Sequence, residues 1–166
     1  EYLNAQVLAY HLGYKFVDAA ELIWFDENGN LDELKTYSEI QKKLQNQGFV
    51  VIPGFYGRDH NGNIKTFDRG GSDITGSIIA RGMAADLYEN WTDVDGIMTD
   101  DPRLSSDAVT ISSMNYEELL NMTQNGAKVY HPDAVHPVKM ASIPLRICNT
   151  NKPANLGTMI RKEKTD

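Results

Sequence analysis

A short glycine-containing loop in the middle of the sequence, Arg69-Gly70-Gly71-Ser72-Asp73, constrains the fold of this chain more than any other feature. It stands directly before a helix-like run from Ile74 to Ala85, and the strand-like run after that helix ends at Thr92-Asp93-Val94-Asp95-Gly96. Glycines before a helix let the backbone approach a ligand closely, and the free amide groups of the first helical turn point at that ligand. The pattern therefore predicts a loop, helix and strand that together bind an anionic group, either a phosphate or a carboxylate.

Two charged side chains extend this prediction. Arg69 offers a planar fork suited to a carboxylate or a phosphate, and Asp73 offers a carboxylate for an ammonium group or for organising a metal-bound phosphate. Together they indicate an amino-acid substrate. From these residues alone a second interpretation stays open, in which Arg69 and Asp73 form a surface ion pair and the two glycines make a plain turn.

Helix-like and strand-like runs alternate along the chain, which is typical of an α/β fold with a mainly parallel sheet. We expect helices at Tyr2–Leu12, Thr36–Gln45, Tyr116–Asn125 and Pro132–Ala141, strands at Lys15–Val17, Phe49–Ile52 and Ile143–Ile147, and a hairpin at Phe55–Phe67 that turns at Asp59–Asn63.

Several of these elements carry more detailed expectations. The continuous apolar run Phe49–Ile52 indicates a strand that is buried on both faces. Asn115 and Glu118 have the spacing of a capping box, with Met114 and Leu119 as the flanking apolar pair. The helix near the start of the chain places four apolar side chains on one face: Leu3, Val7, Leu8 and Leu12.

Composition limits the class of protein. A chain of 166 residues suffices for one domain, and a formal net charge of -7 argues against a broad nucleic-acid surface. Cys148 is the only cysteine, so no internal disulfide is possible and a reducing cytoplasm is the expected compartment. No apolar run is long enough to cross a membrane. His131 and His136 lack a third ligand nearby, so we assign them structural roles and assign no metal ligands.

Taken in order, four motifs resemble the aspartokinase family: Arg69–Asp73, Thr92–Gly96, Asp101-Pro102-Arg103 and Gly126-Ala127-Lys128-Val129. The resemblance extends from Glu1 to Gly157-Thr158. It implies the amino-acid kinase fold, a three-layer αβα sandwich, of which residues 1–166 would be the carboxyl-terminal, nucleotide-binding part of the catalytic domain.

The resemblance also implies an activity. Members of the family use ATP with Mg²⁺ to phosphorylate the side-chain carboxylate of L-aspartate, which gives 4-phospho-L-aspartate for the synthesis of lysine, threonine and methionine. A carboxylate oxygen is already a nucleophile at neutral pH, so this transfer depends on alignment and charge neutralisation and requires no dedicated base. The expected partners are L-aspartate and ATP, without nucleic acid or membrane, in a parent protein that forms a homo-oligomer.

By the same resemblance, Arg69 holds the α-carboxylate of the substrate, and Asp73 organises its amino group or the catalytic lysine. Glu1 aligns with a glutamate that contacts substrate in the family. The residues expected to line the site beside Arg69 are Gly70, Gly71 and Ser72.

Lys128 is the expected catalytic cation near the developing phosphate charge. Of the acidic residues after the central strand, only Asp93 is expected to contact nucleotide, whereas Asp95 and Asp100 are expected to be solvated. Two positions differ from many members, since Asp68 replaces a glycine and Met98 a tyrosine. The nucleotide contacts implied by the resemblance are Thr92, Asp93, Met98, Arg103, Lys128 and Val129.

The family's amino-terminal lysine and glycine-rich motif and its regulatory ACT domains have no counterpart in this sequence. We therefore expect residues 1–166 to be inactive as a catalyst on their own. Two alternatives remain: another amino-acid kinase family enzyme that acts on a different carboxylate or phosphate, and a nucleotide-binding fragment without catalysis.

Overall fold

The computed structural model describes residues 1–100, 107–124 and 130–163. The chain forms two compact units, Glu1–Met83 and Ala84–Asp166. The predicted residues Arg103, Lys128 and Val129 lie outside the described part of the chain.

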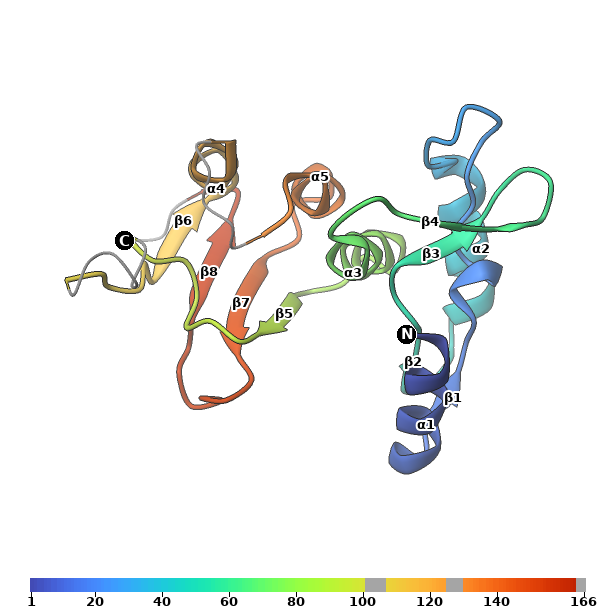
Figure 1. Ribbon diagram of the computed structural model, residues 1–166, viewed down its shortest axis with the longest axis horizontal. Coiled ribbons are helices and arrows are strands. Elements are labelled where there is room, and N and C mark those ends of the chain that lie inside the picture. The colour runs from blue at the N-terminus through green and yellow to red at the C-terminus, as the bar shows by residue number, and fades with distance from the viewer. Residues whose placement is uncertain (101–106, 125–129, 164–166) are drawn as a thin grey trace. The chain divides into compact units, whose positions relative to one another are not determined.

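The first unit combines three α-helices with two pairs of short strands (Figure 1). Strands β1 and β2 pair in parallel, and β3 and β4 form an antiparallel hairpin. In chain order the elements are α1 (Tyr2–Leu12), β1 (Lys15–Phe16), the 3-10 helix η1 (Ala19–Glu21), α2 (Glu33–Leu44), β2 (Val50–Val51), β3 (Tyr56–Arg58), β4 (Ile64–Thr66) and α3 (Gly71–Gly82).

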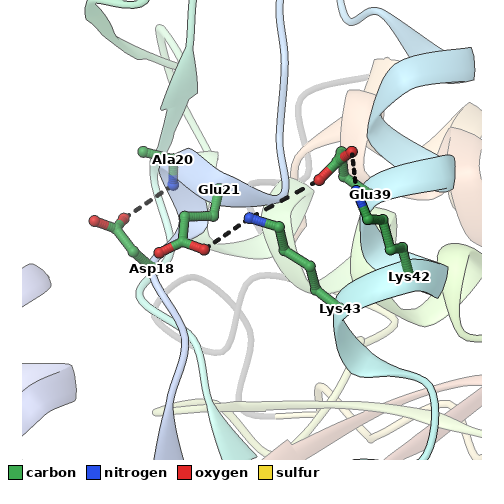
Figure 2. Close-up of polar contacts among 6 residues, drawn as sticks. All are labelled: Asp18, Ala20, Glu21, Glu39, Lys42 and Lys43. Atoms are coloured by element: carbon green, nitrogen blue, oxygen red, sulfur yellow. Dashed lines mark hydrogen bonds and ion pairs between the residues drawn. The ribbon is translucent and has the colours of Figure 1, made fainter.

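Aspartate side chains cap the N-termini of η1 and α2. The Asp18 carboxylate accepts the backbone N–H of Ala20 and so caps η1, and Asp32 caps α2 by accepting the N–H of Lys35. Lys43 of α2 forms an ion pair with Glu21 of η1, and the distance between Nζ and Oε2 is 2.7 Å. Figure 2 shows this contact as a dashed line. The sequence correctly predicted a helix here, but the predicted start at Thr36 is three residues too late, because Asp32 caps the helix and its first residue is Glu33.

One five-residue pattern, Asp-x-Asn-Gly-Asn, occurs twice and folds the same way both times. Asp26 Oδ1 accepts the N–H groups of the residues two and four positions later, at 2.9 and 2.8 Å, and Asp59 does the same at 2.9 and 2.8 Å. The second copy closes the β3–β4 hairpin, which confirms the predicted turn at Asp59–Asn63.

The apolar face of one helix in the first unit is largely exposed, and one burial expectation was wrong. Helix α1 has the predicted bounds, but it buries Ala5 and Ala9, whereas Leu3 and Val7 are 73% and 67% exposed. Strand β2 is only partly buried and pairs with β1 alone, and Phe49 before it is 75% exposed. Apolar periodicity predicted the elements correctly but not the surfaces that they cover.

The second unit is built on a four-stranded sheet in the order β5-β7-β8-β6 (Figure 1). The β5–β7 and β6–β8 pairs are parallel and the central β7–β8 pair is antiparallel. Helix α4 contacts β6, β8 and α5. The elements are β5 (Tyr88–Thr92), β6 (Ser113–Asn115), α4 (Tyr116–Gln124), α5 (Pro132–Met140), β7 (Leu145–Asn149) and β8 (Thr158–Arg161).

Both described helices of this unit begin at a side-chain cap, and the sequence predicted the first of these caps. Asn115 and Glu118 exchange hydrogen bonds at 2.8 and 2.9 Å, which confirms the capping box, and the flanking Met114 and Leu119 are both buried. His131 accepts the N–H of Asp133 and caps α5, a structural role as expected. The predicted end of α4 at Asn125 lies outside the described residues.

The remaining differences concern element bounds. Helix α3 starts at Gly71 rather than Ile74 and ends at Gly82, two residues before Ala84, whose φ of 48° is incompatible with a continuing right-handed helix. Strand β7 runs to Asn149, two residues beyond the predicted end, and the sequence did not reveal β6 or β8. Most strand pairs are parallel, in agreement with the predicted fold class.

Among the described helices, none has the length and apolar character needed to cross a bilayer.

Candidate functional site

The predicted anion-binding loop lies at the start of α3 in the first unit. Gly70 precedes the helix in the left-handed conformation, with φ 60° and ψ 19°, and its carbonyl accepts the N–H of Ile74 at 2.9 Å. A residue with a side chain is disfavoured in this conformation, so glycine is favoured where the chain enters the helix. The N–H groups of the first helical turn are oriented toward the N-terminal end of the helix, as an anion site needs.

Close packing against a second loop fixes the position of this helix start. A Cβ added at Gly71 would lie 2.6 Å from Cδ2 and 3.0 Å from Cα of Phe55, and one added at Gly54 would lie 2.9 Å from Cα of Ser72. Real Cβ atoms do not approach other heavy atoms so closely. Gly54 and Gly71 are therefore needed for the β2–β3 loop to contact the predicted substrate loop.

A cavity of about 500 Å³ adjoins this contact, since Phe55 is also part of its wall. Two carboxylates, Glu1 and Asp18, line it, which gives the cavity a negative side suited to an ammonium group. The other lining residues are Tyr2, Phe55, Tyr56, Ile64 and Thr66.

Asp18 is held in place by two donors. Its Oδ1 accepts the Ala20 N–H at 2.9 Å and the Tyr56 hydroxyl at 2.7 Å. Burial, followed by the hydrogen bond and the charge of Asp18, raises the pKa of Tyr56 well above its usual value. Tyr56 therefore remains a neutral hydrogen-bond donor to Asp18 throughout the physiological pH range.

The predicted nucleotide loop follows β5 in the second unit. Thr92 ends β5 opposite Asn149 of β7, so the carboxyl ends of two parallel strands meet there. This is the edge at which open α/β sheets bind ligands. The Thr92 carbonyl accepts both the N–H and the hydroxyl of Thr150, at 2.8 and 2.6 Å, while Asp93 is exposed at the same edge.

Asp95 corrects one expectation, because it is not a solvated member of an acidic loop. Its Oδ1 accepts the Asn149 amide at 2.5 Å and its Oδ2 accepts Lys152 Nζ at 2.7 Å. The hydrogen bond from Lys152, together with that from Asn149, lowers the pKa of Asp95 below its usual value. Asp95 therefore stays ionised and ties the β5 loop to the loop after β7.

The other predicted site residues divide between the two units. In the first, Arg69 and Ser72 are exposed and Asp73 is half-buried, all within one turn of the α3 start. In the second, Met98 is half-buried and pairs with Thr110 in an isolated antiparallel bridge.

Sequence reasoning missed four residues that shape these sites: Phe55, Asp18, Asn149 and Lys152. The bonds of Asp18 and Asn149 that matter here span 38 and 54 residues, and no local pattern indicates such contacts. Phe55 alone had a usable signal. It follows Pro53-Gly54 at the carboxyl end of a predicted strand, where ligand loops are expected.

The profile of the amino acid kinase family matches residues 1–149. The chain belongs to the amino acid kinase family. It is 38% identical over 165 residues to aspartokinase 3 of Bacillus subtilis, covering 95% of this chain and 36% of that protein.

Solved structures agree with this assignment. Aspartate kinase of Clostridium acetobutylicum is 52% identical with a TM-score of 0.93, over 97% of this chain and 37% of that one. Aspartokinase III of E. coli in complex with aspartate and ADP is 30% identical with a TM-score of 0.85, over 92% of this chain and 35% of that one. The chain thus has the amino-acid kinase fold and spans little more than a third of the length of these relatives.

Proposed function

We propose that the chain is the carboxyl-terminal, nucleotide-binding part of an aspartokinase catalytic domain. The protein to which it belongs would transfer the γ-phosphoryl group of ATP to the side-chain carboxylate of L-aspartate. The observation that carries this proposal is the close packing of Gly71, at the start of α3, against Phe55, which lines the cavity together with Glu1 and Asp18. The similarity to an E. coli enzyme that binds aspartate and ADP supports the choice of substrate.

An α-amino acid suits this part of the first unit because the surroundings carry both signs of charge. Arg69 and the backbone amide groups at the start of α3 would hold the α-carboxylate, with Gly70, Gly71 and Ser72 lining this part of the site. On the cavity side, Glu1 would attract the ammonium group, with Asp73 organising that group or the catalytic lysine. An uncharged alcohol or a phosphate monoester would leave one of these charges uncompensated.

The transfer itself requires positioning more than acid–base chemistry. A side-chain carboxylate oxygen of aspartate would attack the γ-phosphorus while the bond from that phosphorus to the β–γ bridging oxygen breaks, giving 4-phospho-L-aspartate and ADP. Charge on the transferred group must be neutralised, and Lys128 is the side chain we assign to this role. No proton is removed from the nucleophile, so no general base is assigned.

ATP would enter as its magnesium complex and bind the second unit at the carboxyl end of β5. Thr92 and Asp93 lie at that edge. Thr150 donates a hydrogen bond to the Thr92 carbonyl, and Lys152 binds Asp95 in the same loop. The further nucleotide contacts we propose are Met98, Arg103, Lys128 and Val129. A cytoplasmic location and a homo-oligomeric parent are part of the same proposal.

Calorimetric titration with L-aspartate and with magnesium–ATP tests the binding half of the proposal. Arg69→Ala should weaken aspartate binding and leave ATP binding unchanged, whereas Asp93→Ala and Lys128→Ala should weaken ATP binding. Arg161→Ala is the matched control, because Arg161 is also an exposed arginine but lies at the end of β8. Aspartate binding that is indifferent to Arg69→Ala would contradict the assigned site.

The reaction is tested on a polypeptide extended to the length of the relatives. Phosphorylation of aspartate in preference to glutamate and uridylate is expected. Turnover with glutamate or uridylate but not aspartate would favour another enzyme of this family, and ATP binding without any turnover would favour a nucleotide-binding role.

A further inference from the structure

One buried hydroxyl joins the two loops of the candidate substrate site. Thr75 lies on α3, one turn after Gly71, and is only 4% exposed. Its Oγ1 accepts the backbone N–H of Phe55 at 3.1 Å and donates to the carbonyl of Gly71 at 2.7 Å. A single side chain thus connects the β2–β3 loop to the first residue of the helix.

Phe55 is held from its other side as well. Its carbonyl accepts the N–H of Phe67 at 3.0 Å, and Phe67 leads through Asp68 directly to Arg69. Both backbone polar groups of Phe55 are therefore engaged, one by the segment that enters the substrate loop and one by the helix that leaves it.

The backbone conformation of Phe55 is one that needs support from its surroundings. Its φ is 86°, in the left-handed half of the map that non-glycine residues rarely adopt. Such a conformation persists only where the surrounding structure over-determines it. The side chain that this backbone presents lines the cavity beside Glu1 and Asp18.

We propose that Thr75 is a positioning residue for substrate binding: its hydroxyl holds Phe55 and the Arg69–Asp73 loop in the geometry that recognises the amino acid. This inference rests on the proposed function of the first unit. Thr75 does not contact the substrate itself. Without its hydroxyl, the Phe55 N–H loses its acceptor and Phe55 is free to relax toward a more favourable φ.

Two substitutions at Thr75 and a control at a second buried threonine make the test specific. Thr75→Val keeps the shape of the side chain and removes the hydroxyl, whereas Thr75→Ser keeps the hydroxyl. Thr36 provides the matched control in the same unit. It is fully buried, and its hydroxyl makes the same two kinds of bond, accepting the Trp24 N–H at 3.0 Å and donating to the Trp24 carbonyl at 3.3 Å.

The experiment compares L-aspartate affinity by calorimetry and amide hydrogen exchange by NMR in the chain and its variants. Thr75→Val should raise the Kd for aspartate about tenfold, an effect of the size expected when one buried hydrogen bond is lost. Thr75→Ser should stay within about twofold of wild type, and so should Thr36→Val even though it lowers stability. Equal Kd values for Thr75→Val and Thr36→Val would overturn the proposal.

Hydrogen exchange separates this inference from the function on which it rests. Thr75→Val should accelerate exchange at the Phe55 amide relative to Thr36→Val at equal global stability. If the folded wild-type chain binds no aspartate, the proposed function is wrong for this chain, and the exchange result alone decides whether Thr75 holds the loop. Unchanged exchange at Phe55 in Thr75→Val would refute the positioning role in that case too.

Discussion

Replacing Gly71 by alanine tests whether the contact between the two substrate loops is as tight as the structure indicates. The new Cβ would lie 2.6 Å from Cδ2 of Phe55, 3.0 Å from its Cα and 3.1 Å from Cβ of Phe67. The Phe55 ring can rotate away, but its backbone is tied at both ends and cannot move without breaking a hydrogen bond. The substitution therefore strains the site rather than filling a gap.

The expected cost follows from two opposing effects. Forcing an extra methyl group into a packed site costs about 1–3 kcal/mol. Alanine is favoured over glycine by up to about 1 kcal/mol inside a helix, and Gly71, as the first residue of α3, gains only part of that. The net prediction for Gly71→Ala is a destabilisation of about 1–2 kcal/mol.

Urea unfolding followed by circular dichroism measures this change, and calorimetry with L-aspartate measures its effect on the site. The unfolding midpoint should fall without a change in slope, and the Kd for aspartate should rise by at least about threefold. Gly48→Ala is the control, because no atom lies within 4 Å of its added Cβ, and it should change stability by less than about 0.5 kcal/mol. A Gly71→Ala chain with the stability and affinity of wild type would refute the packing argument.

Three further predictions concern the second unit. Lys152 lowers the pKa of Asp95 in the folded state, so the ionised carboxylate stabilises the fold at pH values above about 3.9, the pKa of this group in the unfolded chain. This stabilisation is lost as the pH falls through the pKa of Asp95 in the folded state. Asp95→Asn should therefore lose less stability than wild type between about pH 6 and pH 3 in urea titrations, and an equal loss would contradict the bond. Burial raises the pKa of Tyr116 to about 12, so its neutral form stabilises the fold below the unfolded value of about 10 and this stability is lost as the pH rises toward 12. The free energy of unfolding of Tyr116→Phe should therefore fall less steeply with rising pH than that of wild type over this alkaline range. At neutral pH the variant should be less stable than wild type, because the hydrogen bond to the Ile143 carbonyl is gone. Glu118→Ala removes half of the capping box and should cost about 0.5–1 kcal/mol by urea unfolding, whereas an unchanged midpoint would show that the box does not stabilise α4.

The candidate site was only partly visible in the sequence. The helix start beside the Arg69–Asp73 loop and the strand end at Thr92 were both predicted, because a glycine-containing helix start and the end of a strand are defined by neighbouring residues. The binding roles of these residues stay predictions. The distant residues that hold these two segments in place were not predicted. Thr75 and Phe55 are 20 residues apart, and Asp95 and Lys152 are 57 apart, so nothing near either residue indicates its partner.

What the sequence by itself determined was local structure. The turn at Asp59–Asn63 and the Asn115–Glu118 capping box formed as predicted, because each depends on hydrogen bonds that span two to four residues. Local sequence therefore specified this turn and this helix start, although the starts of α2 and α3 were each predicted three residues too late.

Only the tertiary structure decided which surfaces are covered and how strands pair. The apolar face of α1 is exposed at Leu3 and Val7 while Ala5 and Ala9 are buried, and β7 runs antiparallel to β8 although both belong to an α/β sheet. Burial and strand direction depend on which distant segments come together, and hydrophobic attraction is non-directional, so an apolar pattern specifies that a face can be buried but not against what.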